Sequence, residues 1–193
     1  MDKEELNQAR TNPEFLDYLE KTRINAIATE DIAALYEVLD SLLILDLDEE
    51  KINSVYQNIL KISFDRVDAI VNNDKKLSLD NEQMFYIRAL YEHGIEKWSY
   101  EDFSGSKDLL FVLANIVEDE LLSNAIQVHI IALSKRITLD DFYEKQVDLN
   151  SCNSIEKYGY FITNFNFNLG QHLLDNKVLL KEEYEKLKHL LDA

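Results

Sequence analysis

The residues best suited to metal binding or nucleophilic catalysis are four histidines and one cysteine. They are His93, His129, His172, His189 and Cys152. No histidine stands in an HExxH or Glu-x-x-His pattern, the spacings that bring zinc or di-iron ligands to one face of a helix. A zinc site built on Cys152 would require several histidines that are distant in sequence to converge. We therefore predict no metal site and no cofactor.

The sequence also lacks the motifs for calcium binding, phosphate binding and acyl transfer. Asp46, Asp48 and Glu50 have the alternate spacing that opens an EF-hand calcium loop. However, the position that requires glycine holds Lys51 and the closing acidic position holds Gln57, which excludes an EF-hand. The four glycines form no Gly-rich phosphate loop, and no GxSxG elbow is present. We predict no catalytic residues and a non-enzymatic protein.

Composition indicates an almost wholly α-helical protein. The 193 residues are 46% hydrophobic, enough for a sizeable core, and include four glycines and one proline. A sheet protein of this size needs more tight turns than these residues supply, because hairpin turns favour residues at positive φ. Apolar residues instead recur at helical spacing along most of the chain. We predict an all-α fold of about eight helices, arranged as a multi-helix bundle or a short stack of helical hairpins.

Capping residues mark the starts of the expected helices. The candidates are Asn12 before Pro13, Asp31, Asp46 or Asp48, Asp80 with Gln83, Ser99 with Asp102, and Thr138. Two segments, Leu109–Val117 and Leu121–Leu133, are apolar on nearly all sides, which indicates burial. The first is short enough to suit a strand, but no second strand candidate is available to pair with it. We predict that residues 109–133 form a central helical hairpin.

Residues 158–169 carry two competing periods. Phe165, Phe167 and Leu169 alternate with asparagines, as in a strand. A helical period instead connects Ile155, Tyr158, Ile162, Phe165, Leu169 and Leu173. The helical period explains more residues, so we predict a helix here. The chain then ends in an amphipathic helix at Leu179–Leu191.

A short pattern, apolar-x-Leu-Asp, precedes three of the expected helices. It starts at Leu45, Leu77 and Ile137, so its spacings are 32 and 60 residues. Such spacings suit stacked helical hairpins, although the signatures of the common helical repeats are absent. Alternatively, the pattern is only a favourable helix start, an apolar staple followed by a capping Asp. The sequence leaves both interpretations open.

The chain length fits one domain. We predict a single all-helical domain over 1–193 with a soft subdivision near 99–106, around Ser104-Gly105-Ser106. The longest apolar runs are well short of the roughly 20 residues that a membrane-spanning helix needs. Met1–Leu6 lacks the basic start and apolar stretch of a secretory signal, and a lone cysteine gives no sign of an oxidising compartment. We expect a cytoplasmic protein that does not bind membranes.

The formal net charge is −17, and the first 50 positions carry −10 of it. Such a chain repels nucleic-acid phosphate, so we expect no direct binding to nucleic acid. A charged face usually signifies only solubility, but a basic protein partner would relieve the repulsion between its carboxylates. We predict a protein–protein interaction module (an adaptor, a chaperone or an immunity-type inhibitor) that presents an acidic helical surface to a basic partner. The predicted partner-binding residues are Glu30, Glu37, Asp40, Asp46, Asp48, Glu49 and Glu50.

The alternative is a helical enzyme or a small-ligand-binding protein, with a pocket between the central hairpin and residues 158–173. The candidate pocket residues are His129, Tyr158, Tyr160, Asn164 and His172. The competing interpretation is ordinary core, since a histidine on an apolar helix face is more often hydrogen-bonded than a ligand. A third hypothesis is a structural oligomer with contacts through Trp98 and the final helix. The sequence does not decide the oligomeric state.

Overall fold

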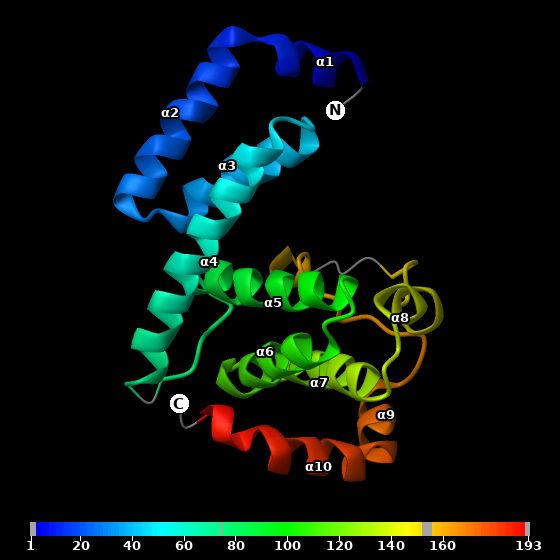
Figure 1. Cartoon of the computed structure of the whole chain (residues 1–193). Helices are drawn as coiled ribbons and strands as arrows, with labels where there is room; N and C mark the ends of the chain where they lie inside the picture. The colour runs from blue at the N-terminus through cyan, green and yellow to red at the C-terminus, as the bar shows by residue number, and fades with distance from the viewer. Residues whose placement is uncertain (1–2, 74, 152–155, 192–193) are drawn as a thin grey trace. The chain divides into compact units, whose positions relative to one another are not determined.

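The computed structural model describes residues 3–73, 75–151 and 156–191. These residues form ten α-helices, which confirms the all-α class with more helices than the eight expected. The helices are α1 (Lys3–Thr11), α2 (Pro13–Thr29), α3 (Ile32–Ile44), α4 (Glu49–Val71), α5 (Gln83–Ser99), α6 (Phe103–Ile116), α7 (Glu120–Ser134), α8 (Leu139–Gln146), α9 (Leu169–Asp175) and α10 (Lys177–Leu187) (Figure 1). Two 3-10 turns, η1 (Glu156–Tyr158) and η2 (Lys188–Leu191), complete the described elements.

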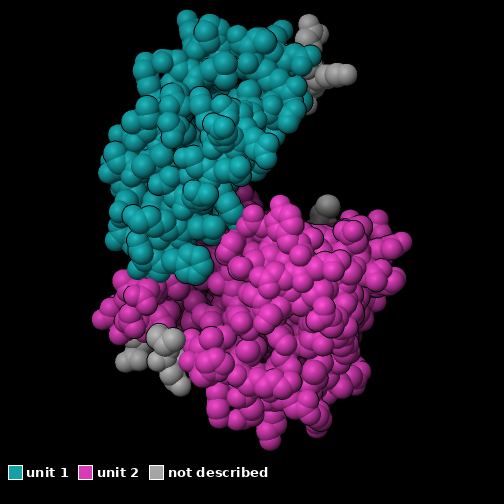
Figure 2. All heavy atoms as spheres, viewed as in Figure 1, with its two compact units in different colours: residues 1–66 teal, residues 67–193 magenta. Residues whose placement is uncertain are grey.

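The chain divides into two compact units, residues 1–66 and residues 67–193 (Figure 2). Unit 1 contains α1, α2, α3 and most of α4, and unit 2 contains the rest of the chain. Residues 99–106, where a soft subdivision was expected, span the last residue of α5, the connection at 100–102 and the start of α6, all inside unit 2. The single domain over 1–193 stays a prediction.

Side-chain caps begin several helices where the sequence predicts them. The Asn12 side chain accepts hydrogen bonds from the backbone N–H groups of Glu14 and Phe15, and Pro13 occupies the first helical position. Asp31 caps α3 and Thr138 caps α8 in the same way. These bonds satisfy N–H groups that have no partner inside the helix, which is why helix starts can be predicted from sequence.

Two predicted caps are wrong in detail. Asp102 alone caps α6, by accepting from the N–H of Gly105, whereas Ser99 is the last residue of α5 and donates to the carbonyl of Glu96. The expected cap by Asp80 is not formed, because α5 begins later, at Gln83, without a side-chain cap bond. The Gln83 side chain instead accepts from the N–H of Ser78.

Charged residues in the left-handed conformation end four helices. Glu30, Asp46, Glu101 and Arg136 have φ values of 54°, 49°, 59° and 54°, and no glycine among the described residues has a positive φ. At each position, two successive N–H groups bond back to carbonyls of the last helical turn, so the chain reverses within a few residues. A side chain in this conformation costs about 1 kcal/mol or more relative to glycine. Tight turns are thus made here without glycine.

The predicted central hairpin forms the middle of unit 2. Helices α6 and α7 pack against each other, α5 covers α6 on one side and α10 contacts α7 on the other (Figure 1). Gly94 of α5 permits close approach, since a Cβ there would lie 2.8 Å from Cδ2 of Leu110. Trp98 is 1% exposed and donates from Nε1 to the carbonyl of Ile137, 2.9 Å away. Its burial contradicts the hypothesis of an oligomer contact through Trp98.

The predicted helix over residues 158–169 is wrong. Only Glu156–Tyr158 makes a 3-10 turn, residues 159–168 are not helical, and α9 begins at Leu169; Ile155 lies outside the described residues. The backbone of this segment bonds to another part of the chain: Asn166 N–H donates to Gln146 at 2.9 Å, and Asp148 N–H donates to Asn164 at 3.1 Å. Pairing with residues 146–148 replaces internal helical bonds, so the strand-like alternation was the better guide here.

The apolar-x-Leu-Asp pattern is not a structural repeat. In its first copy Asp48 caps α4. In its second copy Leu77 pairs with Val117 in an isolated bridge, and in its third Thr138, not Asp140, caps the helix. Three different local structures share one short pattern, because apolar and capping residues are needed at many helix starts.

Candidate partner-binding site in the first unit

Acidic charge is concentrated in unit 1. Residues 1–66 hold fifteen Asp and Glu against seven Lys and Arg, so about a third of the chain carries −8 of the net charge of −17. Because an excess of carboxylates makes the local electrostatic potential more negative, this unit attracts cations more strongly than an average part of the chain does.

A cavity of about 190 Å³ lies within unit 1, among α2, α3 and the start of α4. Its apolar lining consists of Leu16, Leu19, Val38, Leu42 and Leu47. The side chains on α2 and those on α3 follow helical spacing, which places them on the facing sides of two packed helices. Leu19, Val38 and Leu42 are at most 5% exposed, so the cavity has a buried apolar floor.

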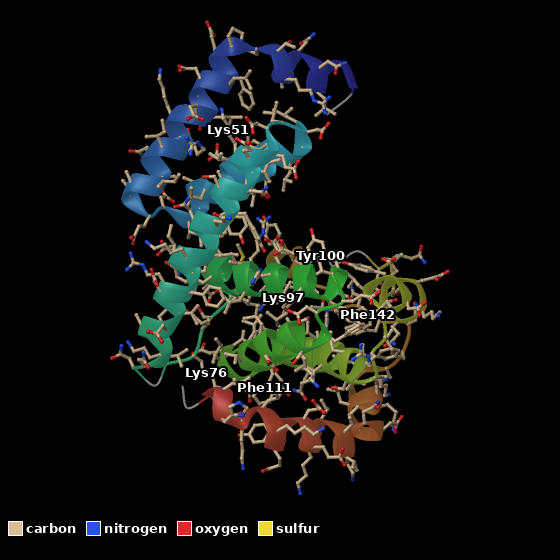
Figure 3. All side chains as sticks on the ribbon, viewed as in Figure 1. Lys51, Lys76, Lys97, Tyr100, Phe111 and Phe142 are labelled. Carbon is tan, nitrogen blue, oxygen red and sulfur yellow. The ribbon has the colours of Figure 1, made fainter. Side chains whose placement is uncertain are left out.

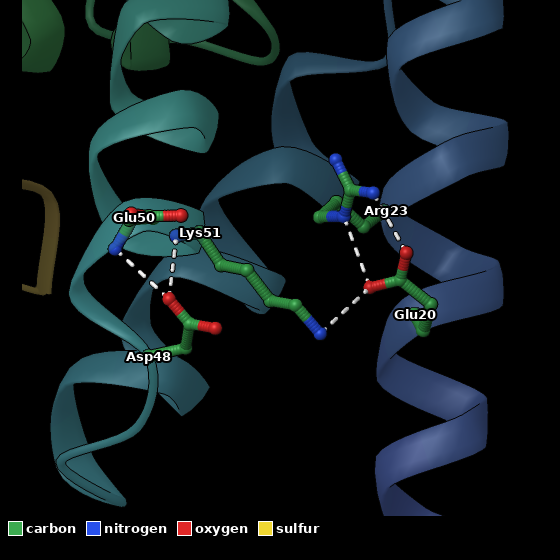
Figure 4. A network of polar contacts seen from close by, with 5 residues as sticks. All are labelled: Glu20, Arg23, Asp48, Glu50 and Lys51. Carbon is green, nitrogen blue, oxygen red and sulfur yellow. Dashed lines mark hydrogen bonds and ion pairs between the residues drawn. The ribbon is translucent and has the colours of Figure 1, made fainter.

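Four charged residues complete the lining, and three of them form an ion-pair network (Figure 4). The Glu20 carboxylate accepts two hydrogen bonds from Arg23, at 2.7 and 3.1 Å, and lies 3.4 Å from Nζ of Lys51. The hydrogen bonds from Arg23 lower the pKa of Glu20 to about 2; burial opposes this shift and the charge of Lys51 adds to it. Glu20 therefore stays ionised, and its charge is balanced by two cations.

Three further carboxylates at the start of α4 have no cationic partner in the described part of the chain. Oδ1 of Asp48 accepts from the N–H groups of Glu50 and Lys51, at 2.9 and 3.3 Å, while Oδ2 makes no hydrogen bond there. Figure 4 shows Oδ2 on the side toward which the Lys51 side chain extends. The side chains of Glu49 and Glu50 are exposed. The cavity therefore has unpaired negative charge next to it.

The other four predicted partner-binding residues already take part in interactions within the chain. Glu30 pairs with Arg66 at 2.8 Å and Asp46 pairs with Arg10 at 3.6 Å. Glu37 accepts from the Tyr18 hydroxyl at 3.1 Å. Asp40 is half-buried and also takes part in an interaction. Of the seven predicted residues, only Asp48 lines the cavity, and Glu49 and Glu50 follow it in the first turn of α4.

Sequence reasoning missed Glu20, Arg23 and Lys51. The spacing of Glu20 and Arg23, three residues apart on one helix, is a signal that would have predicted their pairing. Nothing in the sequence connects Lys51 to Glu20, because the two residues meet only through the packing of α2 against the start of α4.

The alternative pocket residues do not line one cavity. His129 is fully buried: its Nδ1 lies 2.7 Å from the carbonyl oxygen of Ala125 and its Nε2 lies 3.0 Å from the Tyr91 hydroxyl. Since a carbonyl only accepts, Nδ1 carries the hydrogen and Nε2 accepts from Tyr91, whose oxygen in turn accepts from the N–H of Ile162 at 3.0 Å. All polar atoms of the imidazole are satisfied, as expected for a core histidine.

Aromatic rings surround this histidine. The ring of Phe142, which points inward from α8 in Figure 3, lies 5.0 Å from that of His129, and the Trp98 ring lies 6.0 Å away. Burial lowers the pKa of His129 to about 4, although the hydrogen bond to Ala125 opposes the shift. The imidazole is therefore neutral at physiological pH, and it is shielded from solvent.

The remaining candidates lie apart from His129. Tyr158 and Asn164 line a shallow pocket of about 390 Å³ formed by the end of α8 and by residues 147–151 and 158–164. Its lining among the described residues includes none from 109–133, so this pocket is not the predicted one against the central hairpin. Tyr160 stacks over the guanidinium of Arg88, 3.9 Å away, and His172 stacks on Phe167 with ring centres 4.2 Å apart.

Among the described residues, no group of three or more His, Cys, Asp or Glu side chains is arranged to hold a metal ion. No helix in the described ranges combines the length and apolar character that crossing a bilayer requires. Comparisons of the chain with protein-family models, with curated proteins and with solved structures give no match.

Proposed function

We propose that this chain is a non-enzymatic protein-interaction module whose unit 1 binds a basic partner protein. The observation that carries the proposal is the apolar cavity of unit 1 next to the unpaired carboxylates of Asp48, Glu49 and Glu50. Apolar surface supplies affinity, while charge of one sign steers a partner of the opposite sign and excludes partners of the same sign. An adaptor, a chaperone and an inhibitor of a basic protein would all use such a surface.

The experiment compares partner capture from native lysate at about 50 mM and about 500 mM salt, over which the screening length falls several-fold. A neutral triple variant, Asp48→Asn, Glu49→Gln and Glu50→Gln, removes three charges but keeps a capping side chain at position 48. The control variant Glu118→Gln, Glu120→Gln and Asp140→Asn removes three exposed charges near helix starts of unit 2.

We expect the wild type and the control variant to capture the same basic protein at low salt. The neutral triple variant should not capture this protein, and high salt should release the protein from the wild type. Equal capture by the neutral triple variant, or capture that is unaffected by salt, would contradict the proposal. Recovery of no partner together with a bound small molecule in native mass spectrometry would favour a ligand-binding protein instead.

A further inference from the structure

We propose that the partner of unit 1 inserts one large apolar side chain, carried on a basic α-helix, into the cavity lined by Leu16, Leu19, Val38, Leu42 and Leu47. A lysine or arginine about one helical turn away would pair with Asp48, Glu49 or Glu50. This inference rests on the proposed function and names the chemistry of the partner.

The size of the cavity selects a side chain rather than a cofactor. Pockets for drug-sized ligands have volumes of about 300–1,000 Å³, whereas an apolar cavity of about 150 Å³ holds a molecule of the size of benzene. At about 190 Å³, the cavity of unit 1 matches a single phenylalanine, leucine or methionine side chain. Its buried floor of Leu19, Val38 and Leu42 is apolar. Three of the four charged residues in its lining, Glu20, Arg23 and Lys51, already pair with one another.

The secondary structure around the cavity selects a helix. An extended peptide binds by adding a strand to a sheet edge, and the described residues form no sheet. A polyproline segment needs a groove lined by aromatic rings, and this cavity is lined by leucine and valine. Of these three recognition modes, the one that fits an all-helical, leucine-lined cavity is a helix laid against helices, which presents anchors three or four residues apart.

Charge selects a basic partner over a second copy of this chain. The charge of Glu20 is balanced by Arg23 and Lys51, so the attraction comes from the unpaired carboxylates, above all from Asp48, the one of the three that lines the cavity. Two copies of unit 1, each at −8, would repel each other at this face. Side chains one turn apart on a helix are about 5–6 Å from each other, which suits an apolar anchor in the cavity and a cation at Asp48.

The test uses two labelled peptides of about 20 residues, long enough to be helical, made of alanine and lysine. One carries a single phenylalanine four residues from a lysine, and the other has alanine in its place. Fluorescence anisotropy measures the affinity of each peptide for the full chain at about 50 mM salt. Burying the phenylalanine should strengthen binding about tenfold or more over the alanine peptide.

Variants locate the binding site. Leu16→Phe fills the cavity from its α2 wall and should abolish the difference between the two peptides, while Leu179→Phe, at a half-buried leucine of α10, should leave the difference unchanged. The neutral triple variant should weaken both peptides by a similar factor. Circular dichroism checks that each variant is folded, and the comparison of the two peptides on the wild type holds even if Leu16→Phe does not fold.

Equal, salt-dependent binding of both peptides to the wild type would contradict the proposed apolar anchor. The proposed function, an acidic interaction module, would still hold. Binding of neither peptide would also overturn the anchor, and the lysate experiment then decides the proposed function separately. Analytical ultracentrifugation of the chain alone tests whether a second copy of the chain occupies the cavity. A wild-type dimer that dissociates in Leu16→Phe would assign the cavity to a second copy and overturn the proposal.

Discussion

Acidification from about pH 7.5 to about pH 4.5 is expected to destabilise unit 2 through the buried side chain of His129. The imidazole is 0% exposed, and its nitrogens are committed to the Ala125 carbonyl and the Tyr91 hydroxyl. Protonation of Nε2 would convert it from an acceptor into a donor, so the Tyr91 hydroxyl hydrogen would lose its acceptor. The native state therefore resists protonation.

The magnitude follows from the two pKa values. The pKa of His129 is about 4 in the folded chain and 6.5 in an unfolded one. Between these values the unfolded chain binds a proton that the native chain does not, so stability falls as pH decreases from about 6.5 to about 4. At 1.36 kcal/mol per pKa unit, the full loss is about 3 kcal/mol.

Urea unfolding of the wild type and of His129→Gln at the two pH values measures this loss. Carboxylates with a lowered pKa, such as Glu20 and Asp119, also make the folded state less stable on acidification. Their contribution is the same in both proteins, so it cancels in the comparison. Because pH 4.5 is still above the folded pKa, the wild type should lose about 2.5 kcal/mol more than His129→Gln between the two pH values. His189→Gln, at an exposed histidine, should behave as the wild type does. The reasoning is refuted if wild type and His129→Gln show the same pH dependence.

Three further changes test other parts of the structure. Tyr91→Phe removes the hydroxyl between His129 and the N–H of Ile162, so we expect a loss of about 1–3 kcal/mol in urea unfolding and faster hydrogen exchange at Ile162. Asp119→Ala removes the cap of α7 and the acceptor of the Tyr158 hydroxyl, and it should lower the free energy of unfolding by about 2 kcal/mol. Glu101→Gly relieves a left-handed backbone at an exposed residue, and it should raise that free energy by about 1 kcal/mol.

Each of these changes has a matched control. Tyr100→Phe removes the hydroxyl of an 80% exposed tyrosine and should leave stability unchanged. Asp119→Asn keeps a capping oxygen and should recover part of the loss seen with alanine. Glu101→Ala keeps a Cβ in the left-handed conformation and should give no gain; a gain equal to that of glycine would show that side-chain charge, not backbone strain, limits stability.

The sequence by itself determined the features that depend on neighbouring residues. Asn12 with Pro13, Asp31 and Thr138 begin helices because a side-chain oxygen reaches N–H groups two or three residues ahead, a contact independent of the rest of the fold. The apolar character of residues 109–133 was enough to predict the buried α6–α7 hairpin. The acidic imbalance of the first third of the chain is also a property of composition alone.

Only the tertiary structure decided which distant residues meet. The backbone of residues 159–168 leaves helical geometry because its hydrogen bonds go to Gln146, to Asp148 and, 71 residues away in sequence, to Tyr91. Lys51 reaches Glu20 only because α2 and the start of α4 lie on two sides of one cavity. Local propensity is a matter of a few tenths of a kcal/mol per residue, and a hydrogen bond or buried side chain supplied by a distant segment outweighs it.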